Sequence, residues 1–203
     1  HESTPLKGLD TAAPGVLDGV RFLRDAAFGR MPPQLGRTVV VGGGNVAIDA
    51  ARSARRGGAQ VTVVYRRTRA EMPAYPEEIE EAQAEGISLM YLTQPVAAVT
   101  DKGRVAALTC RRMELGTADE SGRRQPAPVA GSEFRIPCDT VISAVGQKVA
   151  AKDAWGLRLT RDGTYEVDLV TLATSRERVF AGGDCARGPA SVVQAIGDGQ
   201  LGA

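Results

Sequence analysis

Residues 37–78 read RTVVVGGGNVAIDAARSARRGGAQVTVVYRRTRAEMPAYPEE. Residues 38–41 are an uncharged β-branched run, which is typical of a parallel strand buried on both faces. A glycine-rich turn at 42–44 follows at once, then a helix over 46–56 and a second apolar strand over 61–65. A strand, a glycine turn, a helix and a strand within about thirty residues predict a Rossmann-like α/β fold.

The glycine turn matches the dinucleotide fingerprint G-x-G-x-x-G/A, with alanine in the third place. We expect Gly42 to permit the tight turn, Gly44 to let a pyrophosphate approach the backbone, and Ala47 to let the helix pack closely on the strand. The free N–H groups of the helix and its positive dipole end then face the phosphates. Because the strand and helix context is present, dinucleotide binding is favoured over an incidental glycine-rich turn.

The end of the second strand indicates which dinucleotide binds. NAD sites place an acidic residue there for the ribose 2′-OH, whereas NADP sites place arginine there for the 2′-phosphate. This chain has YRRTR at 65–69 and no acidic residue before Glu71. A guanidinium can donate two hydrogen bonds to a phosphate, which a carboxylate would repel. Arg66 and Arg67 therefore favour an NADP(H) site over the alternative, a solvated basic turn. We expect Arg69 to contribute less to binding the 2′-phosphate, because it lies further past the strand end.

Composition argues against several other functions. The 203 residues carry a net charge of +1 with a pI near 7.9, so no nucleic-acid or membrane surface is indicated. There is no apolar run of about twenty residues and no signal segment. The cysteines Cys110, Cys138 and Cys185 form no C-x-x-C, and the only histidine is His1, so a redox disulfide, an iron–sulfur ligand run and imidazole chemistry are unsupported. We expect a reduced, cytoplasmic protein with buried thiols and no metal site.

The remaining segments predict an α/β pattern with a β-meander attached to the parallel sheet. Helices are expected over 16–27, over 77–85 and from about 191. Strands are expected over 87–92, 96–100, 104–114, 134–136 and 138–146, with a polar connection over 116–131 and short strands within 151–180. The chain begins without methionine and stops inside the last helix, so we expect it to be part of a longer polypeptide.

Four segments occur in one order: GGGNVAIDAAR at 42–52, VTVVYRRTRAEMPAYPEE at 61–78, DTVISAVGQ at 139–147 and VFAGGDCARGPASVVQAIGDGQ at 179–200. Together they resemble the small (beta) subunit of NADPH-dependent glutamate synthase and the related electron-input part of dihydropyrimidine dehydrogenase. In that family an NADPH domain is inserted into a two-part FAD domain. The resemblance implies a linker and helix leading in at 1–35, an NADPH-binding domain at 36–146, and the C-terminal part of the FAD domain at 147–203.

The resemblance also implies roles for individual residues. Those implied to contact the nicotinamide nucleotide are Gly42, Gly43, Gly44, Asn45 and Val46, with Arg66 and Arg67 at its 2′-phosphate and Ala144, Val145 and Gly146 near the domain junction. On the flavin side, Asp184 would accept a hydrogen bond from the ribityl chain, and Gly183 would let the flavin backbone pass. Ser191 and Val192 would begin the helix whose N-terminus faces the isoalloxazine. For Asp184 the alternative is a turn aspartate that caps the helix.

The implied activity is hydride transfer from NADPH to FAD, followed by single-electron passage to iron–sulfur clusters, with no side-chain acid or base. A large catalytic subunit or another electron acceptor would be the partner. Nothing here corresponds to the first FAD half or to the cysteine-rich domain of that family. We therefore expect this chain alone to be inactive, and its uncovered half-domain to self-associate as a homodimer.

Rival enzyme classes lack their motifs. A short-chain dehydrogenase needs Tyr-x-x-x-Lys, a zinc alcohol dehydrogenase needs Cys and His ligands, and a thioredoxin reductase needs C-x-x-C, none of which occurs here. The alternative that stays open is a non-catalytic NADP(H)-binding or regulatory module.

Overall fold

The computed structural model describes the chain except residues 1, 5–12, 119–123, 150–154 and 203. The chain divides into two compact units, one formed by residues 5–146 and the other by residues 1–4 together with 147–203. We call them the nucleotide unit and the C-terminal unit.

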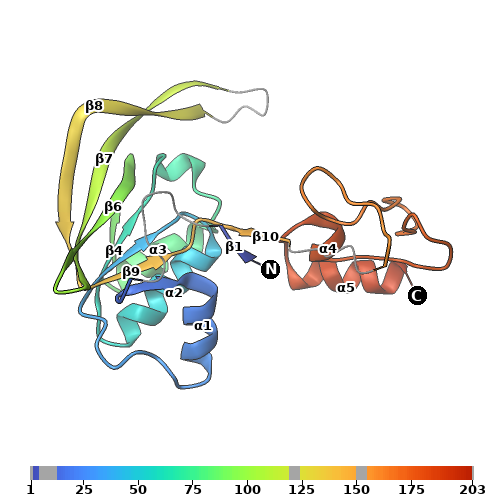
Figure 1. The fold of residues 1–203 in the computed structure, drawn as a ribbon, viewed down its shortest axis with the longest axis horizontal. Helices are drawn as coiled ribbons and strands as arrows, with labels where there is room; N and C mark the ends of the chain where they lie inside the picture. The colour runs from blue at the N-terminus through green and yellow to red at the C-terminus, as the bar shows by residue number, and fades with distance from the viewer. Residues whose placement is uncertain (1, 5–12, 119–123, 150–154, 203) are drawn as a thin grey trace. The chain divides into compact units, whose positions relative to one another are not determined.

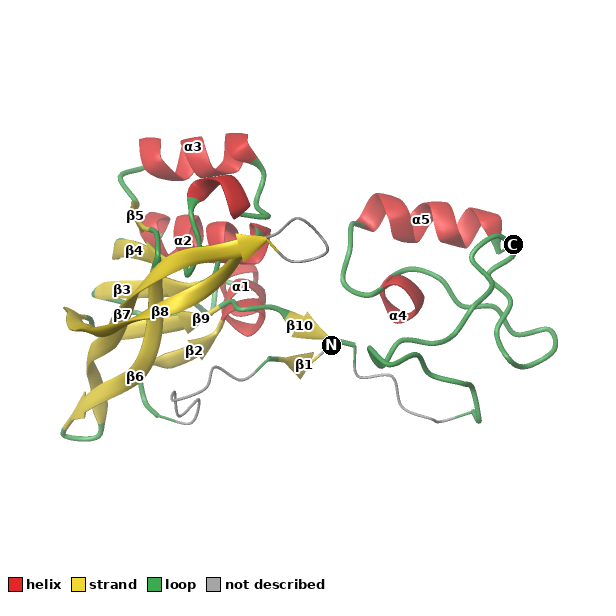
Figure 2. Cartoon of the chain, turned by 90° about the horizontal axis from the view of Figure 1, so that it is seen from above, coloured by secondary structure: helices red, strands yellow, loops and turns green. Residues whose placement is uncertain are grey.

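The nucleotide unit has a five-stranded parallel sheet at its centre (Figure 1). Its strands lie in the order β2 (Val16–Asp18), β9 (Thr140–Ser143), β3 (Arg37–Val41), β4 (Gln60–Val64) and β5 (Ser88–Met90). One face packs against the helices α1 (Gly19–Ala27), α2 (Asn45–Arg56) and α3 (Pro76–Ala84). The other face packs against an antiparallel sheet of β6 (Thr93–Asp101), β7 (Arg104–Ala118) and β8 (Arg124–Pro137), as Figure 2 shows.

The alternation of side chains along the central strands explains these three layers. Val40, Val63 and Ile142 belong to the apolar cluster on the helix side of the sheet. Their neighbours Val39 and Val141 point the other way, into a second cluster shared with the antiparallel sheet. Because both faces are buried, the parallel strands carry apolar side chains at nearly every position, as the sequence predicted.

Two expectations about the nucleotide unit were wrong. Val16–Asp18 is a strand that pairs with β9, and the helix expected over 16–27 begins only at Gly19, where the Asp18 carboxylate accepts from the N–H of Arg21 at 2.8 Å. The polar connection expected over 116–131 is largely strand, since β7 extends to Ala118 and β8 begins at Arg124. In both cases strand pairing outweighs the local pattern: β2 pairs with β9, which is distant in sequence, and β7 pairs with β8, which follows it directly.

The C-terminal unit contains little regular structure. β1 (Glu2–Ser3) pairs antiparallel with β10 (Gln147–Lys148), and the short strands expected within 151–180 are isolated bridges in the described part of that segment. Gly183 and Gly188 flank the single turn of α4 (Asp184–Arg187). The expected final helix is α5 (Val192–Leu201). Ser191 and Gln194 cap its N-terminus with reciprocal hydrogen bonds. Of the helices that the structure describes, none has the length and apolarity to cross a membrane.

An exposed ion pair holds the starts of β3 and β9 together. The Asp139 carboxylate accepts from the backbone N–H of Arg37 at 2.8 Å and from its guanidinium at 2.9 and 3.1 Å. These hydrogen bonds lower the pKa of Asp139 to about 2. A carboxyl whose folded pKa is depressed stabilises the fold above its unfolded pKa of about 3.9 and loses that contribution as the pH falls.

We therefore expect Asp139→Asn to lower the free energy of unfolding at pH 7. The difference from the unaltered chain should stay constant down to about pH 5 and narrow between about pH 4 and pH 2. Urea unfolding of both proteins across this pH range measures it. A difference that does not change with pH would show that the ionised carboxylate is not what stabilises this contact.

Candidate functional site

The glycine turn lies where β3 ends beside β4 and β9, which is the topological switch point of the sheet. Gly42 has a φ of +148°, and a Cβ atom there would lie 2.4 Å from the carbonyl oxygen of Ala144. Its N–H donates to the carbonyl of Val64 at 3.1 Å. Only glycine fits this position, because a side chain would collide with the backbone that follows β9.

A short segment after the arginine-rich stretch crosses over the turn. The N–H of Ala74 donates to the carbonyl of Gly43 at 3.1 Å, and the N–H of Tyr75 donates to Oδ1 of Asn45, also at 3.1 Å. A Cβ atom at Gly43 would lie 2.5 Å from the ring of Tyr65. Gly43 and Asn45 thus fix the shape of the turn, a structural task beside the ligand contacts predicted for them.

The start of α2 has the features of an anion site. Gly44 is the N-cap residue, and no side chain caps the helix there. A Cβ atom at Gly44 would lie 3.8 Å from its nearest neighbour, Cγ of Pro73, which is an ordinary van der Waals contact. Ala47 is fully buried and lets α2 lie against β3. The N–H groups of Ala47 and Ile48 donate to the carbonyl of Gly44. Those of Asn45 and Val46, the first two helical residues, have no intrahelical acceptor and point along the positive end of the helix dipole.

The residues after β9 lie beside this turn. The N–H of Ala144 donates to the carbonyl of Val41 at 2.8 Å, which places residues 144–146 next to the glycines. Val145 is 37% exposed, and Gly146 has a φ of +116°. The structure therefore brings Ala144 together with Gly42, although about one hundred residues separate them in the sequence. A nucleotide contact by residues 144–146 stays a prediction.

The three arginines after β4 differ in their surroundings. Arg66 is exposed, and the structure gives its guanidinium no hydrogen bond or ion pair among the residues it describes. Arg67 is only 8% exposed, and its Nε donates to the carbonyl of Arg124 at 3.1 Å. Arg69 points toward α3, where it binds Glu80 at 3.0 Å and Gln83 at 2.9 Å. Only Arg66 leaves its full set of donors for a ligand.

Sequence reasoning did not find the residues that hold this stretch in place. Both oxygens of Glu71 are engaged: one accepts from the N–H and the hydroxyl of Thr68, and the other from the guanidinium of Arg124 at 2.9 and 3.1 Å. The Thr68 hydroxyl above all, with Arg124, lowers the pKa of Glu71. A capping-box spacing, Thr68-x-x-Glu71, was the local signal, whereas nothing local indicated Arg124.

The residues predicted for the flavin side are grouped in the C-terminal unit. Gly183 has a φ of +64°, and its N–H donates to the buried carboxylate of Asp198 at 2.7 Å. Asp198 also binds Arg187, and these two partners lower its pKa. Asp184 accepts from the N–H of Ala190 at 3.2 Å. The sequence reasoning missed Asp198, which holds the Gly182–Gly183 turn against α5.

The start of α5 is exposed. Val192 and Val193 are 75% and 78% exposed, and Ser191 caps the helix by accepting from the N–H of Gln194 at 3.3 Å. Exposed apolar side chains at the start of a helix are typical of a surface that contacts a ligand or another protein. The flavin contacts of Ser191 and Val192 stay predictions.

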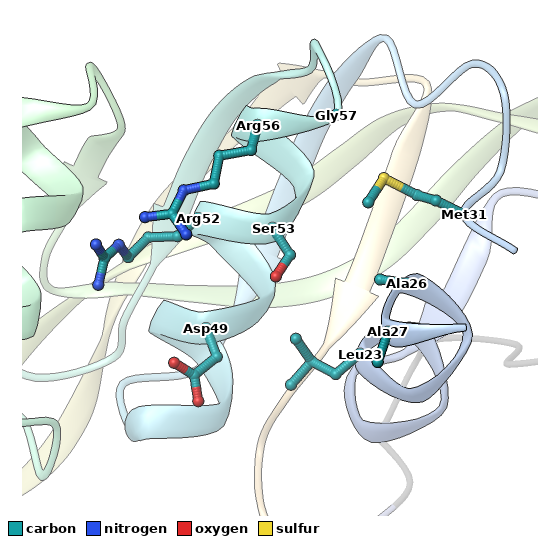
Figure 3. Close-up of a pocket in the computed structure, with 9 residues that line it drawn as sticks. All are labelled: Leu23, Ala26, Ala27, Met31, Asp49, Arg52, Ser53, Arg56 and Gly57. Carbon is teal, nitrogen blue, oxygen red and sulfur yellow. The ribbon is translucent and has the colours of Figure 1, made fainter. Parts of the chain in front are cut away.

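A cavity of about 560 Å³ lies elsewhere, between α1 and the second half of α2 (Figure 3). Leu23, Ala26, Ala27 and Met31 line it on one side and Asp49, Arg52, Ser53, Arg56 and Gly57 on the other, and the side chains of Arg52 and Arg56 point away from α1. Its two arginines already form ion pairs: Arg52 with Glu78, Glu81 and Glu85, and Arg56 with Glu85. These contacts join α2 to α3, so this arginine cluster is structural and separate from the glycine turn.

Two of the thiols are buried, as expected. Cys110 and Cys138 are fully buried, and burial raises their pKa values to about 12 and about 11. Cys185 is half-buried, and its thiol donates to the carbonyl of Gly182. Thiols with raised pKa values are poor nucleophiles at neutral pH.

A parallel sheet with a glycine turn at its switch point is the Rossmann-like α/β architecture. The sequence model of the pyridine nucleotide-disulphide oxidoreductases matches residues 2–199, and the chain belongs to that family. The glutamate synthase resemblance is confirmed: the chain is 40% identical over 167 residues to the glutamate synthase [NADPH] small chain of Azospirillum brasilense, covering 80% of this chain and 34% of that protein.

Other relatives and solved structures carry the names of different oxidoreductases. The identity is 49% over 195 residues with the NADP(+)-dependent formate dehydrogenase subunit beta of Moorella thermoacetica, covering 95% of this chain and 28% of that protein. Among solved structures, FprA of Mycobacterium tuberculosis in complex with NADPH has the same fold, with a TM-score of 0.77 at 22% identity over 99% of this chain and 60% of that one. The chain thus spans about a third of the length of these curated relatives.

Proposed function

We propose that this chain is the NADP(H)-binding portion of a flavin-dependent oxidoreductase. The observation that carries the proposal is the combination of an α2 start that no side chain caps, a glycine at its N-cap and an exposed Arg66 without a partner among the described residues. The helix start suits the pyrophosphate, and Arg66 suits the 2′-phosphate that distinguishes NADP from NAD. Relatives named for NADP(+) and NADPH support this choice of nucleotide.

The residues of the C-terminal unit fit one side of a flavin site. A Cβ atom at Gly183 would lie 3.1 Å from Cβ of Ala195, so the glycine lets this turn lie close to α5, where its N–H donates to Asp198. Asp184 is half-buried, and the exposed start of α5 follows it. A bound flavin supplies hydride and single-electron chemistry, so this chain's residues need only bind and orient the two cofactors.

The final electron acceptor is proposed only as a class. Relatives named as glutamate synthase and as formate dehydrogenase subunits both match the chain, and the formate dehydrogenase subunit matches with the higher identity. We propose a shared role, passing hydride between NADP(H) and flavin and passing electrons onward to iron–sulfur clusters. Both relatives are named as one chain of an enzyme, so a large catalytic subunit is the proposed partner. Self-association as a homodimer stays a prediction.

We expect the purified chain to be colourless, without tightly bound FAD. The G-x-G-x-x-G/A spacing occurs at residues 42–47 and again at residues 197–202, where it falls in and just after α5. Only the first of these follows a strand and opens a helix, and it lies at the proposed NADP(H) site. Any flavin absorbance at about 450 nm should therefore be lost on dialysis. A stoichiometric flavin spectrum that survives dialysis would show that residues 147–203 form a complete flavin site.

The alternative function is an NADP(H)-binding module without turnover, which the glycine fingerprint at residues 42–47 also allows. Reconstitution separates the two functions. The chain is expressed within a polypeptide that supplies the first half of the flavin domain, and NADPH is added without oxygen. Bleaching of the flavin absorbance supports the oxidoreductase, whereas NADPH binding without bleaching supports the module.

A further inference from the structure

The arginine-rich stretch is attached to the antiparallel sheet as well as to the parallel one. The N–H of Leu92, at the start of this sheet, donates to the carbonyl of Arg67 at 3.0 Å. The N–H of Met113 on β7 donates in turn to the carbonyl of Leu92 at 2.8 Å. The backbone after β4 is therefore tied to strands that lie outside the dinucleotide-binding sheet.

Arg124 is the residue through which β8 reaches this stretch. Its carbonyl accepts from Nε of Arg67, and its guanidinium donates twice to Glu71. The side chain of Glu71 is 12% exposed, and its other oxygen closes the turn at Thr68. One residue of β8 thus contacts both ends of the segment 67–71.

We propose that Arg124 is a positioning residue that presents Arg66 to the 2′-phosphate of NADP(H). This inference rests on the proposed function. Arg66 directly precedes the segment that Arg124 holds, and it has no partner of its own among the described residues. Fixing the neighbouring backbone reduces the conformational freedom that Arg66 loses when a phosphate binds. The guanidinium of Arg124 is already engaged with Glu71, so it acts through the segment and not on the phosphate.

The test is a double-mutant cycle on the 203-residue chain with Arg66→Ala, Arg124→Gln and both together. Calorimetric titration with NADPH and with NADH gives the two affinities for each protein. We expect R124Q to weaken NADPH binding roughly threefold to thirtyfold, with NADH binding unchanged. In the R66A background, R124Q should have no further effect on NADPH, because Arg124 acts through Arg66.

Two further variants keep this test decisive. Arg135→Gln changes an exposed arginine of the same strand, which pairs with Thr109 and not with the segment 67–71, and it should bind both nucleotides like the unaltered chain. Arg124→Lys keeps a charge opposite Glu71 and should give an intermediate NADPH affinity, which tests the inference even where R124Q unfolds.

The outcomes distinguish a failure of this inference from a failure of the proposed function. An R124Q effect of the same size with and without Arg66 would overturn the inference, because it would mean that Arg124 affects nucleotide binding independently of Arg66. Unchanged NADPH affinity in both R124Q and R124K, or equal loss of NADPH and NADH, would overturn it too. If R66A itself leaves the NADPH preference intact, the proposed function fails instead.

Discussion

Replacing Arg66 with alanine is expected to weaken NADPH binding roughly tenfold to a hundredfold. The physical reason is the loss of a charge-assisted hydrogen bond, worth about 1.5–3 kcal/mol, at about 1.4 kcal/mol for each factor of ten. NADH carries no 2′-phosphate, so its affinity should barely change. Arg66 is exposed, and its side chain makes no hydrogen bond or ion pair with the residues that the structure describes. The melting temperature should therefore also stay the same.

Arg67→Ala provides the contrasting variant. Arg67 is 8% exposed and donates to the carbonyl of Arg124, so its removal leaves a polar group without its partner and should lower the melting temperature. Calorimetric titration and thermal unfolding of both variants measure these effects. Equal weakening of NADPH and NADH in R66A, or a marked loss of its stability, would show that Arg66 supports the fold and not specificity.

The second large effect is expected from alanine at Gly44. A Cβ atom there meets nothing closer than 3.8 Å, and Gly44 has a φ of −93°, so the chain should fold normally. The added methyl group would occupy the space in which the pyrophosphate approaches the start of α2. We expect affinity for both NADPH and NADH to fall roughly fivefold to a hundredfold, since overpacking typically costs about 1–3 kcal/mol.

Gly42→Ala is the matched comparison within the same turn. Its Cβ atom would lie 2.4 Å from the carbonyl oxygen of Ala144, so this variant should lose stability as well as binding. Thermal unfolding of both variants, with titration of both nucleotides, distinguishes the two effects. Normal nucleotide binding by G44A would mean that the phosphates do not approach the turn at this position.

The local part of the site was predictable from the sequence. The segment β3, glycine turn, α2 and β4 is contiguous, so period, glycine spacing and strand composition indicate it without knowledge of the rest of the chain. Arg66 could be placed at the strand end for the same reason. The different surroundings of Arg67 were not predictable, because the carbonyl that it binds belongs to Arg124 on another sheet.

Strand pairing and contacts between segments distant in sequence account for the remaining differences. Val16 and Leu17 suit a helix face as well as a buried strand, and only their pairing with β9 settles the choice. The polar composition of 116–131 concealed two long strands that stabilise each other through the β7–β8 ladder. The contact of Gly42 with Ala144 and that of Asp198 with Gly183 likewise join segments that no local pattern relates.

The most direct test of the central claim is calorimetric titration of the unaltered 203-residue chain with NADPH and, separately, with NADH. The account predicts saturable binding of NADPH at one site, with an affinity at least about tenfold higher than that for NADH, as expected for one charge-assisted contact with the 2′-phosphate. Equal affinity for the two nucleotides, or no binding of either, would contradict it.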